Sequence, residues 1–129
     1  MKLSTLPLHK AIADRLTAQT GYKIFDDHPE NEDYPYVTMG AVTAASWCDK
    51  FEDGLAIYPK IHVWSRYAGR KEADEMADAI LQALTGSSLD LAPSFRVSFD
   101  SLDSYELLID EDGVTRHGIL IMKYYVEEI

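Results

Sequence analysis

Hydrophobic and polar positions near the end of the chain follow the pattern of one long strand. Residues 114–126 are rich in β-branched and aromatic side chains and contain no proline. In an extended chain, neighbouring side chains point to opposite faces, so both faces of this strand carry apolar groups. One face has Leu120, Met122, Tyr124 and Val126, and the other has Ile119, Ile121 and Tyr125. A single layer of helices covers only one face of a sheet, so we expect another element or a partner to cover the second.

Three further segments have the composition or alternation of strands. They are residues 36–45, 56–65 and 95–103, and a shorter strand is expected at residues 22–25. Asp112-Gly113 is a hairpin signal, which predicts that the region 95–109 pairs antiparallel with the terminal strand. Asp53-Gly54 is a second turn signal, and it places residues 46–54 in a long loop or at the tip of a hairpin.

Two segments have the helical period instead. Leu8, Ile12 and Leu16 recur every four residues, and Gly21 can end that helix. A second helix is predicted over about residues 69–84, with Met76, Ile80 and Leu84 in its apolar stripe. The pattern therefore predicts one α+β domain over residues 1–129. We expect a mainly antiparallel sheet of about four strands with two helices packed on one face.

Composition narrows the possible functions. The formal net charge of −10 argues against a protein that gains its affinity by neutralising nucleic-acid phosphates. Cys48 is the single cysteine, which excludes an internal disulfide and favours a reducing, cytoplasmic setting. The polar N-terminal residues predict neither a signal peptide nor a membrane span.

The candidate chemistry does not indicate catalysis. The four histidines are scattered, the lone cysteine has no neighbouring histidine, and no glycine-rich phosphate loop is present. We therefore expect no catalytic or metal centre and no cofactor. The acidic residues between Asp100 and Asp112 lack the pattern of a calcium loop, which favours a solvated acidic face. Two alternatives remain: a small ligand-binding or metal-dependent enzyme domain using His62 and His117, and a regulatory adaptor of the host.

Two groups of residues are candidates for contacts with other proteins. Trp47 and Phe51 are large aromatics in an otherwise polar segment, and such residues often anchor interfaces. The terminal strand, with Tyr124 and Tyr125, is a second candidate contact. A basic group at the start of the second helix could dock an acidic neighbour, although a solvated cluster balanced by Glu72 and Asp74 is the simpler interpretation; it comprises Arg66, Arg70 and Lys71. Trp64 and Tyr58, on an alternating strand, are most simply core residues.

Several short motifs, in this order, resemble the tail-completion (tail terminator, or tail-to-head joining) protein family of long-tailed phages and prophages. The similarity spans almost the whole chain, while residues 47–53 match nothing diagnostic. The motifs are Tyr34-Pro35-Tyr36-Val37 with Gly40, Ile61-His62-Val63-Trp64-Ser65, Gly69-Arg70 with Glu72-Ala73, Asp112-Gly113-Val114-Thr115-Arg116-His117-Gly118, and Tyr124-Tyr125-Val126-Glu127-Glu128.

The resemblance implies a non-enzymatic structural protein of the virion tail that is assembled in the host cytoplasm. Such a protein would cap the tail tube, end its polymerisation and join the tail to the head connector, as a hexameric ring. Its implied partners are other copies of itself, the tail tube protein and the head-tail connector protein. DNA would pass through the ring without specific binding, because an acidic ring repels phosphate.

Overall fold

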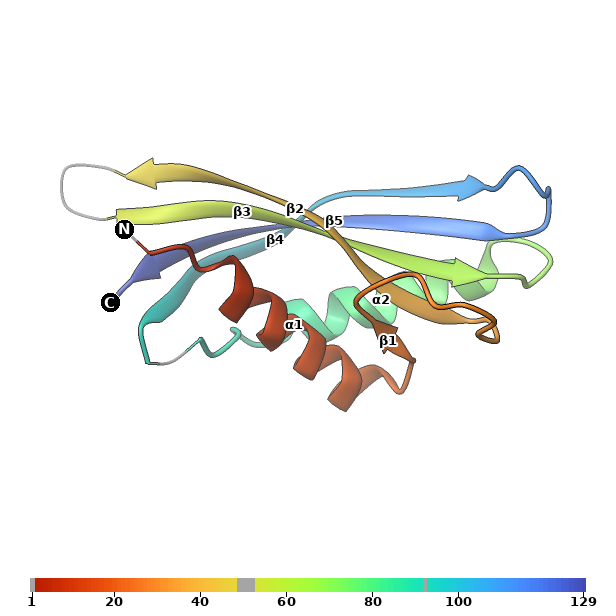
Figure 1. Ribbon diagram of the computed structural model, residues 1–129, viewed down its shortest axis with the longest axis horizontal. Coiled ribbons are helices and arrows are strands. Elements are labelled where there is room, and N and C mark those ends of the chain that lie inside the picture. The colour runs from red at the N-terminus through yellow and green to blue at the C-terminus, as the bar shows by residue number, and fades with distance from the viewer. Residues whose placement is uncertain (1, 49–52, 92) are drawn as a thin grey trace.

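The computed structural model describes residues 2–48, 53–91 and 93–129 of the chain. These residues form two helices and five strands, with three strands after the first helix and two after the second (Figure 1). In chain order they are α1 (Thr5–Thr20), β1 (Ile24–Phe25), β2 (Tyr36–Cys48), β3 (Asp53–Ser65), α2 (Lys71–Thr85), β4 (Phe95–Ile109) and β5 (Arg116–Glu128). The predicted α+β class and both predicted helices are confirmed.

The five strands form one sheet in the order β1-β2-β3-β5-β4. Every neighbouring pair is antiparallel except β1 and β2, which are parallel. The fifth strand arises because the short segment Ile24–Phe25 pairs with the start of β2 and lengthens the predicted sheet of about four strands by one. The terminal strand β5, which the sequence predicted as one long strand, lies between β3 and β4. Its backbone is therefore hydrogen-bonded to a neighbouring strand on both sides.

The β2–β3 hairpin is longer than the sequence pattern predicts. Trp47 pairs with Gly54, and Cys48 pairs with Asp53, so most of the polar segment 46–54 belongs to the ends of the two strands. The segment is therefore the tip of a hairpin, with residues 49–52 outside the described part. Strand β4 also continues past residue 103 and pairs with β5 as far as Ile109 opposite Arg116.

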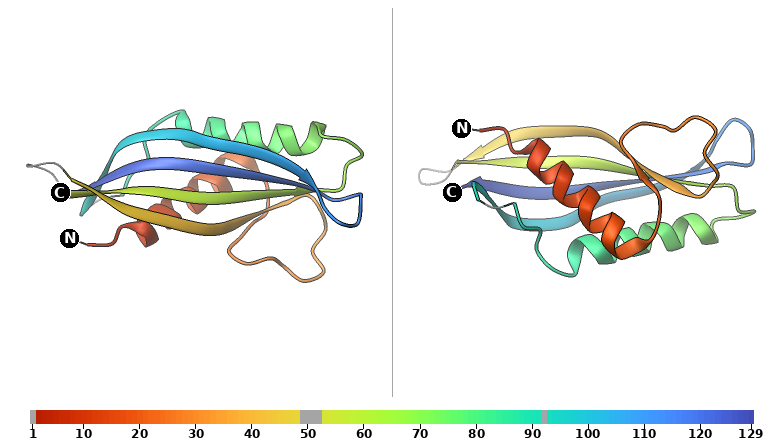
Figure 2. Two further views of the ribbon diagram at one scale, coloured as in Figure 1. Left: turned by 90° about the horizontal axis from the view of Figure 1, so that it is seen from above. Right: turned by 60° about the horizontal axis from the view of Figure 1, so that its bottom comes forward.

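Both helices pack on the same face of the sheet (Figure 2). α1 buries Leu8, Ile12 and Leu16 as predicted, and it ends at Gly21, whose positive φ of 74° suits a residue without a side chain. α2 buries Met76, Ile80 and Leu84 against the sheet, and each of these side chains is fully buried. The sheet side of this core comes from alternate positions of the strands, including Ile57, Ile61, Val63, Leu120, Met122, Tyr124 and Val126.

The opposite face of the sheet has no helix over it (Figure 2). Its side chains are the intervening positions, because neighbours along a strand alternate between faces. We call this surface the helix-free face. Among the described residues, neither helix is long and apolar enough to cross a membrane.

Candidate functional site

The helix-free face carries a group of aromatic rings centred on Trp64. The ring of His117 stacks on Trp64, with centroids 3.8 Å apart and planes within 9°. His28 and His62 lie at centroid distances of 5.0 and 6.2 Å from the same indole, and Tyr36 lies at 6.3 Å. We call these five residues the Trp64 cluster. It brings together three of the four histidines in the sequence.

Strand pairing explains why residues so distant in sequence meet. Trp64 pairs directly with His117 across β3 and β5, and His62 is two positions before Trp64 on the same face. The prediction that Trp64 is a core residue is wrong in one respect. Its side chain is half-buried on the helix-free face, while the helix-covered core is filled by the alternate positions of β3. Tyr58, also half-buried, lies on the same face as Trp64.

His62 and His117 share a hydrogen bond. His62 Nδ1 lies 2.6 Å from His117 Nε2, and the ring planes are 26° apart with centroids separated by 4.9 Å. These values place the two imidazoles nearly edge to edge, so one proton between the facing nitrogens satisfies both. Burial lowers the pKa of each imidazole, and the neighbouring His117 and Lys60 lower the pKa of His62 further. Asp110 opposes the fall in the pKa of His117.

Gly40 provides the space for the His62 ring. A β-carbon at position 40 would lie only 2.3 Å from His62 Nε2 and 2.6 Å from its Cδ2. Any side chain there would displace the imidazole and its hydrogen bond to His117. A glycine is thus needed at position 40 because the His62 ring of β3 lies against the backbone of β2. The sequence around Gly40 does not reveal this contact.

A second aromatic group lies near the β2–β3 hairpin tip. Trp47 and Phe99 both pack on Tyr125, with centroids 5.0 and 5.1 Å from it. The Lys123 ammonium lies over the Tyr125 ring at 5.1 Å, which is a cation–π arrangement. The indole nitrogen of Trp47 is buried without a hydrogen-bond partner among the described residues. We call Trp47, Phe99, Lys123 and Tyr125 the Trp47 cluster.

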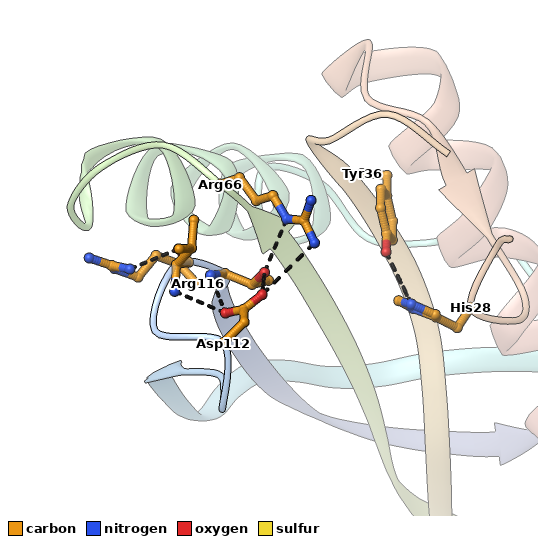
Figure 3. Close-up of polar contacts among 7 residues, drawn as sticks. His28, Tyr36, Arg66, Asp112 and Arg116 are labelled. Atoms are coloured by element: carbon orange, nitrogen blue, oxygen red, sulfur yellow. Dashed lines mark hydrogen bonds and ion pairs between the residues drawn. The ribbon is translucent and has the colours of Figure 1, made fainter. Parts of the chain in front are cut away.

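Arg66 connects the end of β3 to the β4–β5 turn (Figure 3). Its Nε donates to Thr115 Oγ1 at 3.2 Å, and its guanidinium lies over the Tyr34 ring at 4.4 Å. Asp112 accepts hydrogen bonds from the Thr115 hydroxyl at 2.6 Å and from two backbone amides of the turn. These bonds, led by the one from the Thr115 hydroxyl, lower the pKa of Asp112 to about 2. Figure 3 also shows the contact between His28 and Tyr36, from the neighbouring cluster.

Arg70 is engaged within the domain. It pairs with Asp74 at 2.7 Å, and Asp74 also accepts a hydrogen bond from the Tyr105 hydroxyl at 2.8 Å. Both hydrogen bonds lower the pKa of Asp74, and burial raises the pKa of Tyr105. For Arg70, this ion pair agrees with the simpler interpretation, in which Asp74 balances the basic group, whereas Glu72 accepts a hydrogen bond from Ser65 and Arg66 lies near Asp112. Lys71 is exposed at the first residue of α2.

The predicted contact residues of the hairpin tip and the terminal strand do not all lie on one face of the sheet. Trp47 and Tyr125 touch each other on the helix-free face, whereas Tyr124 is fully buried under the helices and is 0% exposed. Tyr124 therefore stabilises the core, and its side chain has no surface to offer a partner, because the alternation along β5 turns it inward. Phe51 lies outside the described residues. His62 and His117, which were predicted to act together in the alternative ligand-binding site, do lie side by side. The gathering of Trp64, Tyr36 and His28 around them was not predicted, because it depends on the β3–β5 register, which a single sequence does not reveal.

The Trp64 cluster contains ring nitrogens but no carboxylate among its five members. Within the part of the chain that the structure describes, no group of three or more histidine, cysteine, aspartate or glutamate side chains is arranged to hold a metal ion. The two facing nitrogens of His62 and His117 are directed at one another and share a proton. What this face offers is stacked aromatic surface with hydrogen-bonding edges, a combination typical of protein contacts.

Comparison with solved structures shows the class of protein to which this fold belongs. A chain of the "Virion of native gene transfer agent (GTA) particle" superposes with a TM-score of 0.80 and 25% sequence identity, over 93% of this chain and 94% of that one. The "Structure of bacteriophage SPP1 gp17 protein" superposes with a TM-score of 0.63 and 25% identity, over 95% and 91% of the two chains. The fold is that of a small structural protein of the virion.

The family follows from sequence. The model of the family "Tail completion protein gp17" matches residues 9–127, and the chain belongs to this phage tail-completion family. The chain is also 27% identical to "Tail completion protein gp17" of Bacillus phage SPP1 over 130 residues, which cover 97% of this chain and 96% of that protein. The resemblance found in the sequence motifs is confirmed.

Proposed function

We propose that this protein caps the assembled tail tube, ends its polymerisation and joins the tail to the head connector. The observation that carries the proposal is the family match over residues 9–127, supported by the superposition on a chain of an assembled virion particle. The protein acts by binding other proteins and not as an enzyme. Its partners are copies of itself, the tail tube protein and the head-tail connector protein, and its place is the virion tail after assembly in the host cytoplasm.

The proposed form of the cap is a ring of six copies, the number that the family resemblance implies. Identical subunits close a ring when each uses two different surfaces, one toward each neighbour. This sheet has such a pair of surfaces, because β4 lies at one edge and β1 with β2 lies at the other. Tyr36 and Thr38 are buried on the helix-free face, but Phe99 is exposed and Trp47 and Tyr125 are half-buried there, so covering these aromatic groups would favour association.

The Trp47 cluster is the better supported of the predicted contacts. Trp47 and Tyr125 present ring surface beside the exposed Phe99, which is 44% exposed. The buried indole nitrogen of Trp47 has no described hydrogen-bond partner, so a partner's carbonyl or carboxylate oxygen could satisfy it after a small rotation. Arg66 and Lys71 remain candidate basic contacts for a neighbour's carboxylates.

The test is a tail-to-head joining assay with a Trp47→Ala variant. An anchoring aromatic contributes roughly 2 kcal/mol or more, so we expect joining to require on the order of 30-fold more protein. Tyr67→Ala is a matched control, because Tyr67 is an exposed aromatic in the β3–α2 connection and belongs to neither cluster. Normal joining by a folded Trp47→Ala variant would remove the Trp47 cluster from the interface.

A further inference from the structure

Both edges of the sheet have long stretches of strand without a neighbour. Among the residues that the structure describes, β4 pairs only with β5, and β1 covers β2 only at Val37 and Thr38. Residues 39–48 of β2 therefore have no strand beside them on their outer side within the described part of the chain. Unpaired backbone amide and carbonyl groups at such an edge are a template for a strand from another chain.

Each edge contains a stretch with regular geometry. β2 has a register shift between Met39 and Val42, after which residues 42–48 pair regularly with β3. β4 has shifts before Phe99 and before Ser104, after which residues 104–109 pair regularly with β5. Bulges interrupt strand addition, so these two stretches, of seven and six residues, are where another strand can pair without interruption.

The charges of the two edges differ. Residues 36–48 of β2 contain no charged side chain, whereas β4 carries Asp100, Asp103 and Glu106. If β4 of one copy paired with β4 of another, these carboxylates would face each other, and like charges across strands are destabilising. A neutral strand avoids this repulsion, so the β2 edge is the better neighbour for β4.

Both edges have apolar surface on the helix side of the sheet. Beside β4, on the helix side, a groove of about 260 Å³ runs between the strand and α2, and it includes Leu81, Leu102 and Tyr105. Leu102 is 37% exposed there. On the β2 edge, Val42 pairs with Pro59, faces the helix side of the sheet, and is 48% exposed. A β2 strand laid against β4 with matching faces brings Val42 to the side of the sheet where this groove is open.

We propose that β4 of one copy pairs with the β2 edge of the next copy, so that the sheet continues from subunit to subunit around the ring. The proposal rests on the ring in the proposed function and names the contact that builds it. Rotation about a ring axis preserves strand directions along that axis. Because β2 and β5 run opposite to β3 and β4, the new pair is antiparallel and continues the alternation of the sheet.

The experiment is cross-linking of introduced cysteines within assembled tails. Cys48 is first replaced by serine, and then Thr43→Cys is combined with Glu106→Cys, or Ala45→Cys with Ser104→Cys. All four positions are exposed and lie on the helix-free side of their strands. Purified tails are treated with a bis-maleimide of about 10 Å, which spans the roughly 7–8 Å between diagonal neighbours on paired strands.

Each double-cysteine protein is expected to give a ladder of covalent multimers, and each single-cysteine control is expected to stay monomeric. The absence of a ladder from both pairs overturns the proposal. Dimers from Thr43→Cys alone also overturn it, because they show β2 against β2. Head joining by the same tails without linker is scored separately. Tails that join heads but give no ladder refute this contact alone, whereas tails that join heads without any of this protein refute the proposed function.

Discussion

His62 Nδ1 lies 2.6 Å from His117 Nε2, although the two residues are 55 positions apart in the chain. The contact exists because β3 and β5 are neighbours in the sheet, with Trp64 paired to His117. A hydrogen bond between two imidazoles needs one nitrogen with a proton and one without. The pair can hold one extra proton on an outer nitrogen, but a second removes the acceptor and sets two cations against each other.

We expect the His62–His117 pair to lower the free energy of unfolding in mild acid. Burial lowers the pKa of both imidazoles below the 6.5 of an unperturbed histidine, so the unfolded chain takes up protons first as the pH falls. The free energy of unfolding should therefore decrease below about pH 6.5, until the lower pKa values of the folded state are reached. Both rings are only half-buried, so we expect the melting temperature to fall by only a few degrees, on the order of 2–4 °C, between pH 7 and pH 5.

The His62→Gln/His117→Gln double variant provides the comparison for that measurement. Its melting temperature should fall less than that of the wild type over the same pH range, since the carboxylates that also titrate are unchanged. Equal slopes for the two proteins would show that the pair does not affect folding stability.

Gly40→Ala should be destabilising because its β-carbon overlaps the His62 ring. The imidazole must move, and we expect a cost of about 1–2 kcal/mol in the free energy of unfolding, measured by urea denaturation. The same substitution in a His62→Ala background should cost much less, because the obstructing ring is gone. An equal cost in both backgrounds would attribute the effect to the β2 backbone.

Patterns within single segments predicted both helices and the positions of the main strands. The helical stripes at Leu8 to Leu16 and at Met76 to Leu84 face the core as predicted, because a period near 3.6 fixes which side is buried. The limits of the strands were less accurate. Cys48 and Asp53 looked like loop residues, yet they pair with each other and extend the hairpin. Strand propensity describes single residues, and pairing depends on the partner strand.

The candidate contact surface was harder to predict. Trp47 stood out as an aromatic in a polar segment, and it does lie on the helix-free face beside Tyr125. Tyr124 and Tyr125 were both predicted as contacts, although the alternation already placed them on opposite faces of the strand, and Tyr124 points into the core. The Trp64 cluster depends on contacts between β3, β5 and the loop before β2, and no local pattern encodes such distant contacts.

Asp112 should give the β4–β5 turn its own dependence on pH. The hydrogen bonds that it accepts lower its pKa to about 2, whereas the ordinary value is 3.8. The stability that this carboxylate provides is therefore fully present above about pH 4 and is lost as the pH falls toward 2. Asp112→Ala should lower the melting temperature at pH 7 and show a smaller further loss in acid. If the melting temperatures of the wild type and of Asp112→Ala fell by equal amounts from pH 5 to pH 2, that result would contradict this role.

Ile80→Asp should abolish stable folding. Ile80 is fully buried where α2 packs on the sheet, and a carboxylate there would have no compensating charge or solvent. We expect a cost of about 3 kcal/mol or more, against about 1 kcal/mol for the matched Ile80→Val change. Circular dichroism during thermal denaturation measures both variants, and a fully folded Ile80→Asp protein would refute this packing of α2.

The role in tail completion is tested most directly by electron microscopy of particles made when this gene is deleted from its phage or prophage. The account predicts separate heads and tails, with tails that are uncapped and irregular in length. Supplying the wild-type chain should restore joined particles, and supplying the Trp47→Ala chain at the same level should restore fewer. Normal numbers of joined particles with tails of normal length in the absence of the chain would contradict the account.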